Sequence, residues 1–165
     1  MPVVADMRAA WARPDAFITR KLAEGVREDR ALAVLMGACV LSFVAQWPAL
    51  ARAAHLDPSV PLDARMGGAL MGVLFLLPLV AYGVAAVTHL AARLIGGRGS
   101  WFGARMALFW AFLASSPLVL LMGLVAGFLG QGVAATATGV AVFGAFLYLW
   151  LRMLYHAESG AAQWT

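Results

Sequence analysis

A histidine and two serines are the residues in the apolar parts of this chain that most resemble a catalytic set. His89 is a candidate base, and Ser115 or Ser116 is the candidate nucleophile, as in an intramembrane hydrolase. At the helical rise, His89 lies about 6 Å inward of Arg93, whereas Ser115 lies about 15 Å inward of Arg105. That difference in depth exceeds hydrogen-bond reach, and the chain contains no Gly-x-Ser-x-Gly elbow. We therefore expect no enzyme, and we expect His89 to be an interfacial histidine bonded to backbone, water or a lipid headgroup.

Acidic side chains are absent from the long apolar stretches, since none occurs between Asp63 and Glu158. Proton-coupled transporters usually place Asp, Glu or His within the membrane, and metal sites there need carboxylate or similar ligands. A single cysteine, Cys39, permits neither an internal disulfide nor a cysteine-rich metal site. The sequence therefore predicts no metal and no cofactor.

A glycine-rich segment between two apolar stretches is the second place where chemistry is conceivable. Its residues are Gly96, Gly97, Arg98, Gly99, Ser100 and Trp101, with Arg93 and Arg105 on either side. It is not a P-loop, because it lacks the Gly-Lys-Ser/Thr ending and follows an apolar helix rather than a strand. Such a turn and its arginines would suit a lipid phosphate or the acidic patch of a partner. The alternative is a tight turn between two helices.

The composition determines which elements position these residues. Of 165 residues, 63% are hydrophobic and only 20 carry charge, and 11 of those 20 lie in residues 1–30. A soluble domain of this size is typically near 25% charged, so the chain requires a lipid surrounding. Four stretches are long enough to cross a hydrocarbon core of about 30 Å: Ala31–Leu50, Met66–Ala92, Met106–Gly130 and Val133–Leu154. They lack the alternation of a barrel strand, so we predict an all-α, polytopic bundle of four transmembrane helices.

The distribution of Lys and Arg predicts the orientation of this bundle. With a cytoplasmic N-terminus, that side receives ten basic residues, and the other side receives only Arg52 and Arg65. Both termini are therefore expected to face the cytoplasm. Trp47, Trp101 and Trp150 fall near predicted helix ends, where indole rings are favoured.

Residues 1–30 are predicted to be helical and amphipathic. Met7, Trp11, Pro14, Ile18 and Leu22 recur at helical spacing, with basic residues between them. Pro14 is expected to start a new helical segment, because its ring suits the first turn. The segment is predicted to be an interfacial helix that lies on the membrane surface, and the alternative is a short cap packed on the other helices.

Prolines and small residues mark possible kinks and contact faces within the predicted spans. Pro78 and Pro117 sit near the middle of their stretches, where each would either kink a packed helix or help to line a transport site together with His89. Neighbours such as Ser115 and Ser116 are expected to bond the carbonyls that a proline frees. Pairs of small residues four apart favour close helix contacts, within the chain or between subunits: Gly68 and Gly72, Ala111 and Ser115, Gly123 and Gly127, and Ala135 and Gly139.

The glycine-rich segment, followed by an apolar helix with Ser116-Pro117 at its midpoint, resembles the signature of the Yip family of multi-pass membrane proteins. The N-terminal stretch with Trp11, Pro14, Phe17 and Leu22, and then Glu28-Asp29-Arg30, is similar to short bacterial members. The resemblance covers most of the chain and implies an integral membrane protein, which in eukaryotes is of a trafficking type that interacts with Ypt/Rab GTPases. Many relatives have five or more spans, and division of the third stretch at Pro117 would supply one more.

These patterns predict a cytoplasmic segment at 1–30, a Yip-like transmembrane domain at 31–155 and a short cytoplasmic tail at 156–165. Eleven Arg against one Lys, with abundant Ala, indicate a GC-rich bacterial genome and hence a bacterial inner membrane. The expected function is that of a non-catalytic scaffold or accessory subunit that binds lipids, other membrane proteins or copies of itself. The alternative is a small-solute or lipid transporter. The arginines are spread along the chain rather than clustered, so no nucleic-acid partner is expected.

Overall fold

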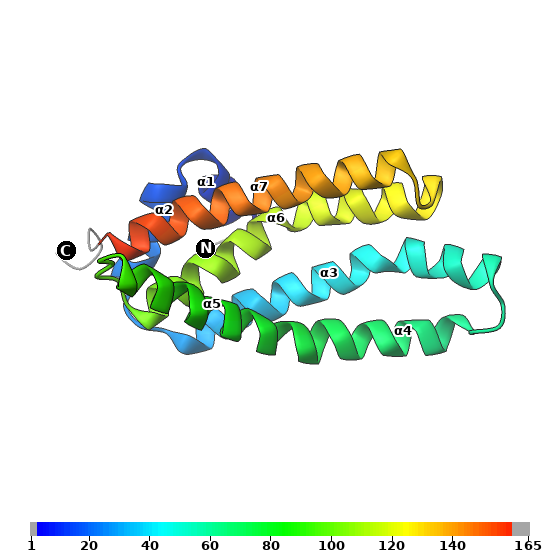
Figure 1. The fold of residues 1–165 in the computed structure, drawn as a ribbon, viewed down its shortest axis with the longest axis horizontal. Coiled ribbons are helices and arrows are strands. Elements are labelled where there is room, and N and C mark those ends of the chain that lie inside the picture. Colours follow the sequence, from blue (N-terminus) through cyan, green and yellow to red (C-terminus); the bar gives the residue numbers. More distant parts are fainter. Residues whose placement is uncertain (1–2, 160–165) are drawn as a thin grey trace.

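The computed structural model describes residues 3–159, and in this range all regular structure is helical. Four long helical segments run side by side along the molecule (Figure 1). They are α3 (Glu28–Leu56), the continuous run of α4 (Leu62–Met71), the π-helical turn η1 (Gly72–Leu76) and α5 (Leu77–Leu94), then α6 (Trp101–Leu129) and α7 (Val133–Glu158). All four are long and apolar enough to cross a membrane, which confirms the predicted helical bundle.

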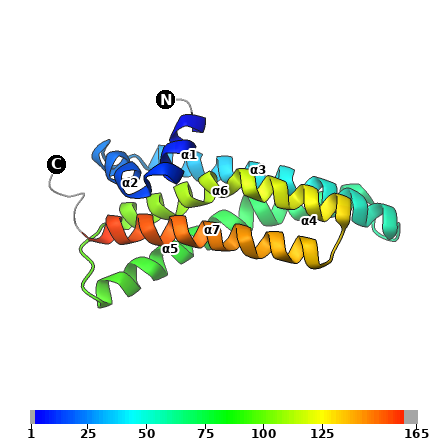
Figure 2. The same ribbon diagram turned by 90° about the horizontal axis from the view of Figure 1, so that it is seen from above.

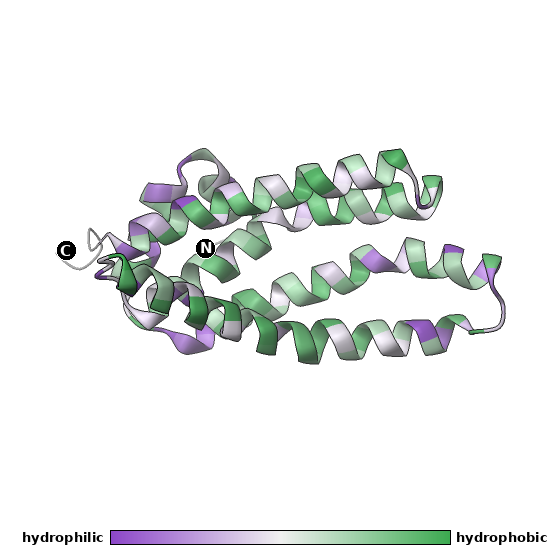
Figure 3. Cartoon of the chain, viewed as in Figure 1, coloured by the Kyte–Doolittle hydropathy of each residue, from purple (hydrophilic) through white to green (hydrophobic). Residues whose placement is uncertain are grey.

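Each helical segment is at least as long as its predicted apolar stretch. At 29 residues, α3 and α6 each measure about 43 Å, against a hydrocarbon core of about 30 Å. The additional turns carry charged or polar side chains, which an apolar count does not include (Figure 3). The third stretch stays one helix through Pro117, so the structure does not divide it there. Residues 156–158, predicted to begin the tail, form the last turn of α7.

The first half of α6 is the centre of the bundle. Nearly every residue from 102 to 116 is buried, because α3, α5, α7 and the N-terminal helices surround it. Three edge-to-face aromatic pairs join α6 to these neighbours, at ring-centroid distances of 4.9, 5.1 and 6.4 Å. The pairs are Trp110 with Phe17, Phe109 with Tyr82, and Phe112 with Phe146. The half of the bundle that holds this centre also carries the loop at residues 95–100, and we call it the loop end; the other is the distal end.

At the distal end, α3 and α6 approach until their backbones touch. A Cβ built on Gly123 would lie 1.8 Å from the carbonyl oxygen of Ala45, and one on Gly127 would lie 2.3 Å from Cβ of Pro48. No other residue type fits these two positions. The small-residue pair at 123 and 127 is therefore a contact within the chain, whereas a Cβ on Gly68 or Gly72 would meet nothing within 4 Å.

Polar side chains close the two turns at the distal end. Arg52 donates to the carbonyl of Phe128 at 3.2 Å, at the end of α6, where carbonyls lack helical partners. In the other turn, Asp57 accepts from Ser59 and then from Arg65, and these hydrogen bonds hold the pKa of Asp57 below its usual value. Arg52 and Arg65 are the two basic residues that the sequence assigns to this end.

The N-terminal residues form two short helices, α1 (Val3–Ala12) and α2 (Pro14–Ala23), and Pro14 opens the second as predicted. They pack against α6 and α7 at one side of the bundle (Figure 2). Ala10, Phe17 and Ile18 are buried in this contact, and Asp15 forms an ion pair with Arg152 of α7, while Nδ1 of His156 lies 3.2 Å from Oδ1 of the same carboxylate. These helices thus pack on the bundle, the arrangement that the sequence left as the alternative to a helix on the membrane surface.

We predict that Gly123→Ala destabilises the fold, because its Cβ would overlap a backbone oxygen that cannot move without separating α3 from α6. The expected loss in free energy of unfolding is roughly 2 to 3 kcal/mol, seen as a lower Tm in detergent or lipid nanodiscs. Gly144→Ala is the matched control, because a Cβ at Gly144 meets nothing within 4 Å. Equal melting of the two variants would contradict the close contact.

Candidate functional site

The glycine-rich loop wraps around the C-terminal end of α7. The backbone N–H of Arg98 donates to the carbonyl of Glu158 at 2.8 Å, and that of Gly99 donates to Oε2 of the same residue at 3.2 Å. The anion held by this loop is therefore a carboxylate of the chain itself. The sequence left two interpretations of this segment: a turn that binds a lipid phosphate or the acidic patch of a partner, and a tight turn between two helices.

Close contacts with the ends of α5 and α7, and one special backbone conformation, explain why the loop is rich in glycine. A Cβ on Gly97 would lie 2.8 Å from the carbonyl oxygen of Ala92, and one on Gly99 would lie 2.5 Å from that of Ala157. Gly96 has φ of +94°, the left-handed conformation that commonly ends a helix. Each of these glycines is thus required by packing or by backbone conformation.

Ser100 and Trp101 begin α6 directly after the loop. Ser100 is the N-cap residue, and its Oγ accepts from the backbone N–H of Gly103 at 3.0 Å. The ring of Trp101 lies over that of His89, with centroids 4.5 Å apart. The loop therefore joins α5, α6 and α7 at one point.

His89 and Glu158 form a buried pair beneath the loop. Nδ1 of His89 lies 2.6 Å from Oε1 of Glu158, and the two residues are only 1% and 6% exposed. The predicted partners of His89 were backbone, water or a headgroup, and the structure has a carboxylate instead. With Oε2 bonded to Gly99, both oxygens of Glu158 are used. A hydrogen-bonded, buried pair of this kind fixes helices relative to one another.

Ser115 and Ser116 do not meet His89 in a catalytic arrangement. The hydroxyl of Ser115 donates to the carbonyl of Ala111 at 2.8 Å, and that of Ser116 donates to the carbonyl of Leu113 at 2.7 Å. The Leu113 carbonyl is the one that Pro117 leaves without an amide donor. The Ser116 hydroxyl therefore bonds the carbonyl that Pro117 leaves free, as the sequence predicted for the serines beside it. At this kink, about halfway along its length, α6 changes direction (Figure 1).

Trp11 of α1 makes a further bond at the kink of α6. Its indole N–H donates to the carbonyl of Ala114 at 2.9 Å. The N-terminal cap is therefore tied to the kink by a hydrogen bond as well as by apolar packing.

Pro78 stands differently, since it follows the π-helical turn η1 and opens α5 within a continuous helix. A π-helical turn of this kind lets a helix continue although the proline cannot donate a backbone N–H hydrogen bond.

The three arginines near the loop have different surroundings. Arg105 forms an ion pair with Glu28 at the start of α3, and its guanidinium lies 5.8 Å from the centre of the Tyr82 ring. Arg93 and Arg98 are exposed near the loop. The structure therefore assigns Arg105 a contact between helices, whereas Arg93 and Arg98 lie at the surface.

A second buried polar cluster lies under the N-terminal cap, and the sequence did not indicate it. Nζ of Lys21 lies 2.9 Å from Oδ2 of Asp6 and 3.2 Å from Oε1 of Glu24, and Lys21 also faces the ring of Trp110. Asp6 is 6% exposed. The ion pairs of this cluster join α1 to α2, and the contact of Lys21 with Trp110 connects them to α6.

Within residues 3–159, no group of three or more His, Cys, Asp or Glu side chains is arranged to hold a metal ion. Comparison with known proteins gives no relative: no family model, no curated protein and no solved structure matches the chain. No family assignment follows. The functional interpretation therefore depends on the geometry described above.

We predict that Glu158→Ala lowers the stability of the protein by about 3 kcal/mol, because it leaves His89 and the Gly99 amide buried without an acceptor. Glu158→Gln retains a carbonyl oxygen and an amide donor, so its Tm is expected to lie much closer to that of the wild type. Thermal unfolding of the purified variants measures the difference. If the Tm of Glu158→Ala equals that of the wild type, the buried pair does not hold the loop end together.

Proposed function

We propose that the protein is a non-catalytic membrane scaffold or accessory subunit, whose lipid-facing surface binds another membrane protein or a second copy of itself. The observation that carries this proposal is the exposed face of α4 and η1. Among the other long helices, this part of the second span packs chiefly on α3, and none of its residues is buried. Much of a possible contact surface is thus unused within the chain.

The chemistry of this face suits a helix partner. A Cβ on Gly67, Gly68 or Gly72 would meet nothing within 4 Å, and Met71 and Phe75 beside them are 60% and 65% exposed. In lipid, helices associate chiefly by close van der Waals packing at small residues, because burial of apolar surface gives no gain over lipid tails. Small and large side chains next to one another offer the ridges and grooves that a second helix needs.

The non-catalytic part of the proposal is supported by how the reactive side chains are used. Ser115 and Ser116 bond backbone carbonyls, and His89 bonds Glu158. The transport alternative depended on His89, Pro78 and Pro117, and their contacts give it no added support. We keep the Yip-family resemblance as part of the proposal, although the glycines that carry it are also accounted for by packing against Glu158.

The proposed location is the bacterial inner membrane, with both termini in the cytoplasm. Ten of the twelve basic residues belong to the loop end under this orientation, and cytoplasmic loops carry the excess of Lys and Arg. Helix α1 and the C-terminal end of α7 lie in the half of the bundle that contains the loop (Figure 1). The exposed Arg93 and Arg98 would then face anionic headgroups.

Crosslinking in native membranes, followed by mass spectrometry, tests the scaffold proposal. We expect one reproducible partner, either another membrane protein or a second copy, crosslinked through α4 or η1. Gly68→Leu with Gly72→Leu is expected to reduce its recovery by about tenfold, because the side chains fill the space that a partner helix would occupy. Gly144→Leu on α7 is the control, with the same side chain introduced at another open position. Recovery of the monomer alone, or equal recovery from all variants, would refute the proposal.

Reporter fusions test the orientation. A fusion after Thr165 and one in the turn between Asp57 and Pro61 are expected to report opposite sides, with the C-terminal fusion cytoplasmic. Substitution of Arg93 and Arg98 by Gln is expected to weaken this bias without abolishing it, since eight basic residues remain on that side. A C-terminal fusion that reports the outer side would overturn the orientation.

A further inference from the structure

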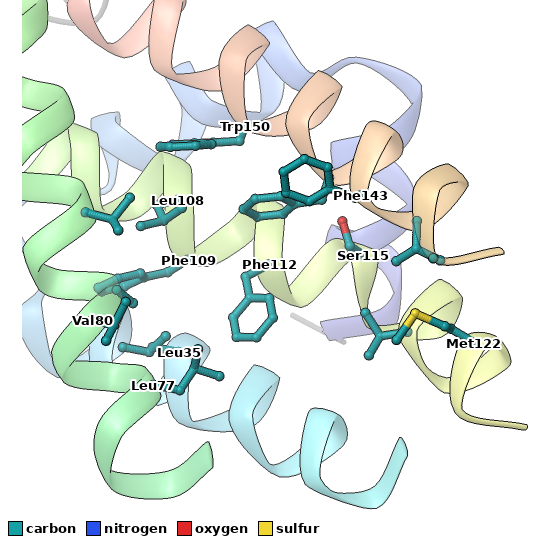
Figure 4. Close-up of a pocket in the computed structure, with 16 residues that line it drawn as sticks. Leu35, Leu77, Val80, Leu108, Phe109, Phe112, Ser115, Met122, Phe143 and Trp150 are labelled. Atoms are coloured by element: carbon teal, nitrogen blue, oxygen red, sulfur yellow. The ribbon is translucent and has the colours of Figure 1, made fainter. Parts of the chain in front are cut away.

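The groove between α5 and α7 does not indicate what fills it. It encloses about 440 Å³ above α6, with Phe109 at its floor and Phe143 and Trp150 on one wall (Figure 4). Its lining is apolar apart from Ser115, whose hydroxyl is bonded to the Ala111 carbonyl. Among the described residues none that lines this groove is charged, so its chemistry favours no particular occupant.

A second groove, which we call the cap groove, combines apolar walls with charged ones. It encloses about 1080 Å³ and is lined by residues of α1, α2, α3 and α6. Along α3 and α6 its lining is apolar as far as Leu41 and Leu113. Its charged lining residues come from the N-terminal cap and the first turn of α3, and they are Asp6, Lys21, Glu24 and Arg30.

The charged residues gather at one end of the cap groove. Glu24 accepts from Lys21 at 3.2 Å and from Arg30 at 3.1 Å, and Lys21, only 9% exposed, also pairs with Asp6. Since α3 begins at the loop end, Arg30 in its first turn lies there too. The polar end of the cap groove therefore faces the same side of the bundle as the glycine-rich loop.

The length of the cap groove agrees with one leaflet of a bilayer. Along α3 its lining extends from Arg30 to Leu41, which is a helical rise of about 16 Å. Half of a hydrocarbon core of about 30 Å is about 15 Å. A molecule that spans this groove thus has a charged group at the bilayer surface and an apolar part that reaches the middle.

The charges at the polar end leave an excess of one positive charge. Three cations, Arg20, Lys21 and Arg30, are paired with only two carboxylates, Asp6 and Glu24. Each of the four carboxylate oxygens already has one of these cations as its partner. Among the described residues, the half-exposed guanidinium of Arg30 has Glu24 as its one partner, so most of its five N–H donors remain for a ligand. The matching group is an anion with several acceptor oxygens, such as a phosphate.

Charge and shape together distinguish the possible occupants. A soluble phosphate would match the polar end but would leave the apolar walls unused. A transmembrane helix of a partner would match the walls, but its backbone oxygens are bonded within the helix and carry no net charge. An anionic phospholipid has both parts in the required order, with its phosphate at the bilayer surface and its acyl chains below.

We infer that the cap groove binds one phospholipid of net negative charge from the leaflet at the loop end, with its phosphate bonded to Arg30 and an acyl chain along α3 toward Leu41. This site uses no residue of α4 or η1, so it goes beyond the proposed function. The experiment below uses the isolated protein, and its failure would leave the partner proposal standing.

The experiment compares two phospholipids with the same acyl chains and different net charge. The full chain, purified in mild detergent, is mixed with equal amounts of anionic phosphatidylglycerol and zwitterionic phosphatidylcholine, and the first lipid retained is identified by native mass spectrometry. We expect the wild type to prefer phosphatidylglycerol about fivefold, as one basic residue beside an anionic lipid predicts. Arg30→Gln leaves two cations against two carboxylates, so its preference is expected to disappear. Arg8→Gln removes the same charge from an exposed position outside the cap groove and is expected to keep the preference.

A second pair of variants tests the apolar part of the cap groove. Ala33→Phe adds bulk within it and is expected to reduce retention of both lipids, whereas Ala141→Phe adds the same bulk at an exposed position that does not line it. Equal lipid retention by these two variants would overturn the cap groove as the site. A wild type that retains both lipids equally, or an Arg30→Gln variant with an unchanged preference, would overturn the anionic headgroup. Recovery of a dimer in place of the lipid adduct would overturn the phospholipid as the occupant.

Discussion

The backbone contact between α3 and α6 is the constraint on which the remaining architecture depends. Gly123 and Gly127 let α6 meet Ala45 and Pro48 at distances that a single methyl group would prevent. In a lipid surrounding, close packing has to replace the hydrophobic effect as the source of helix association. With its distal half held on α3 in this way, α6 can serve as the centre against which α5, α7 and the N-terminal cap pack.

The two ends of the bundle are stabilised by different means as a consequence. The distal end depends on glycine contacts and on arginine bonds to turn residues, whereas the loop end is held by aromatic packing and by two buried polar groups. One is the pair of His89 with Glu158, and the other is Lys21 with its carboxylates. Since α5 and α7 each pack on α6, a groove with apolar walls remains between them. The groove between α5 and α7 thus results from the packing of both helices on α6.

Apolar run length was enough to predict four helices, because crossing a membrane requires about 20 apolar residues whatever their tertiary contacts. Proline chemistry likewise predicted the start of α2 and the bond from Ser116 to the Leu113 carbonyl. The partner of His89 was not predictable by the same means, since Glu158 is 69 residues away and follows the last apolar run. One signal was present: Glu158 is the only acidic residue after Asp63, and the predicted topology puts it on the same side of the membrane as the glycine loop. Which of the four small-residue pairs form contacts within the chain could not be predicted either, because that depends on how the helices pack.

The distance between α3 and α6 in a lipid bilayer tests the central claim most directly. Spin labels at Val44 and Leu124, both partly exposed beside the glycine contact, report it by pulsed electron paramagnetic resonance, with Cys39 replaced by Ala. The account predicts one narrow distance distribution, at the spacing of two helices in backbone contact once the label tethers are allowed for. A broad distribution, or one centred at the spacing of helices separated by a layer of side chains, would contradict it.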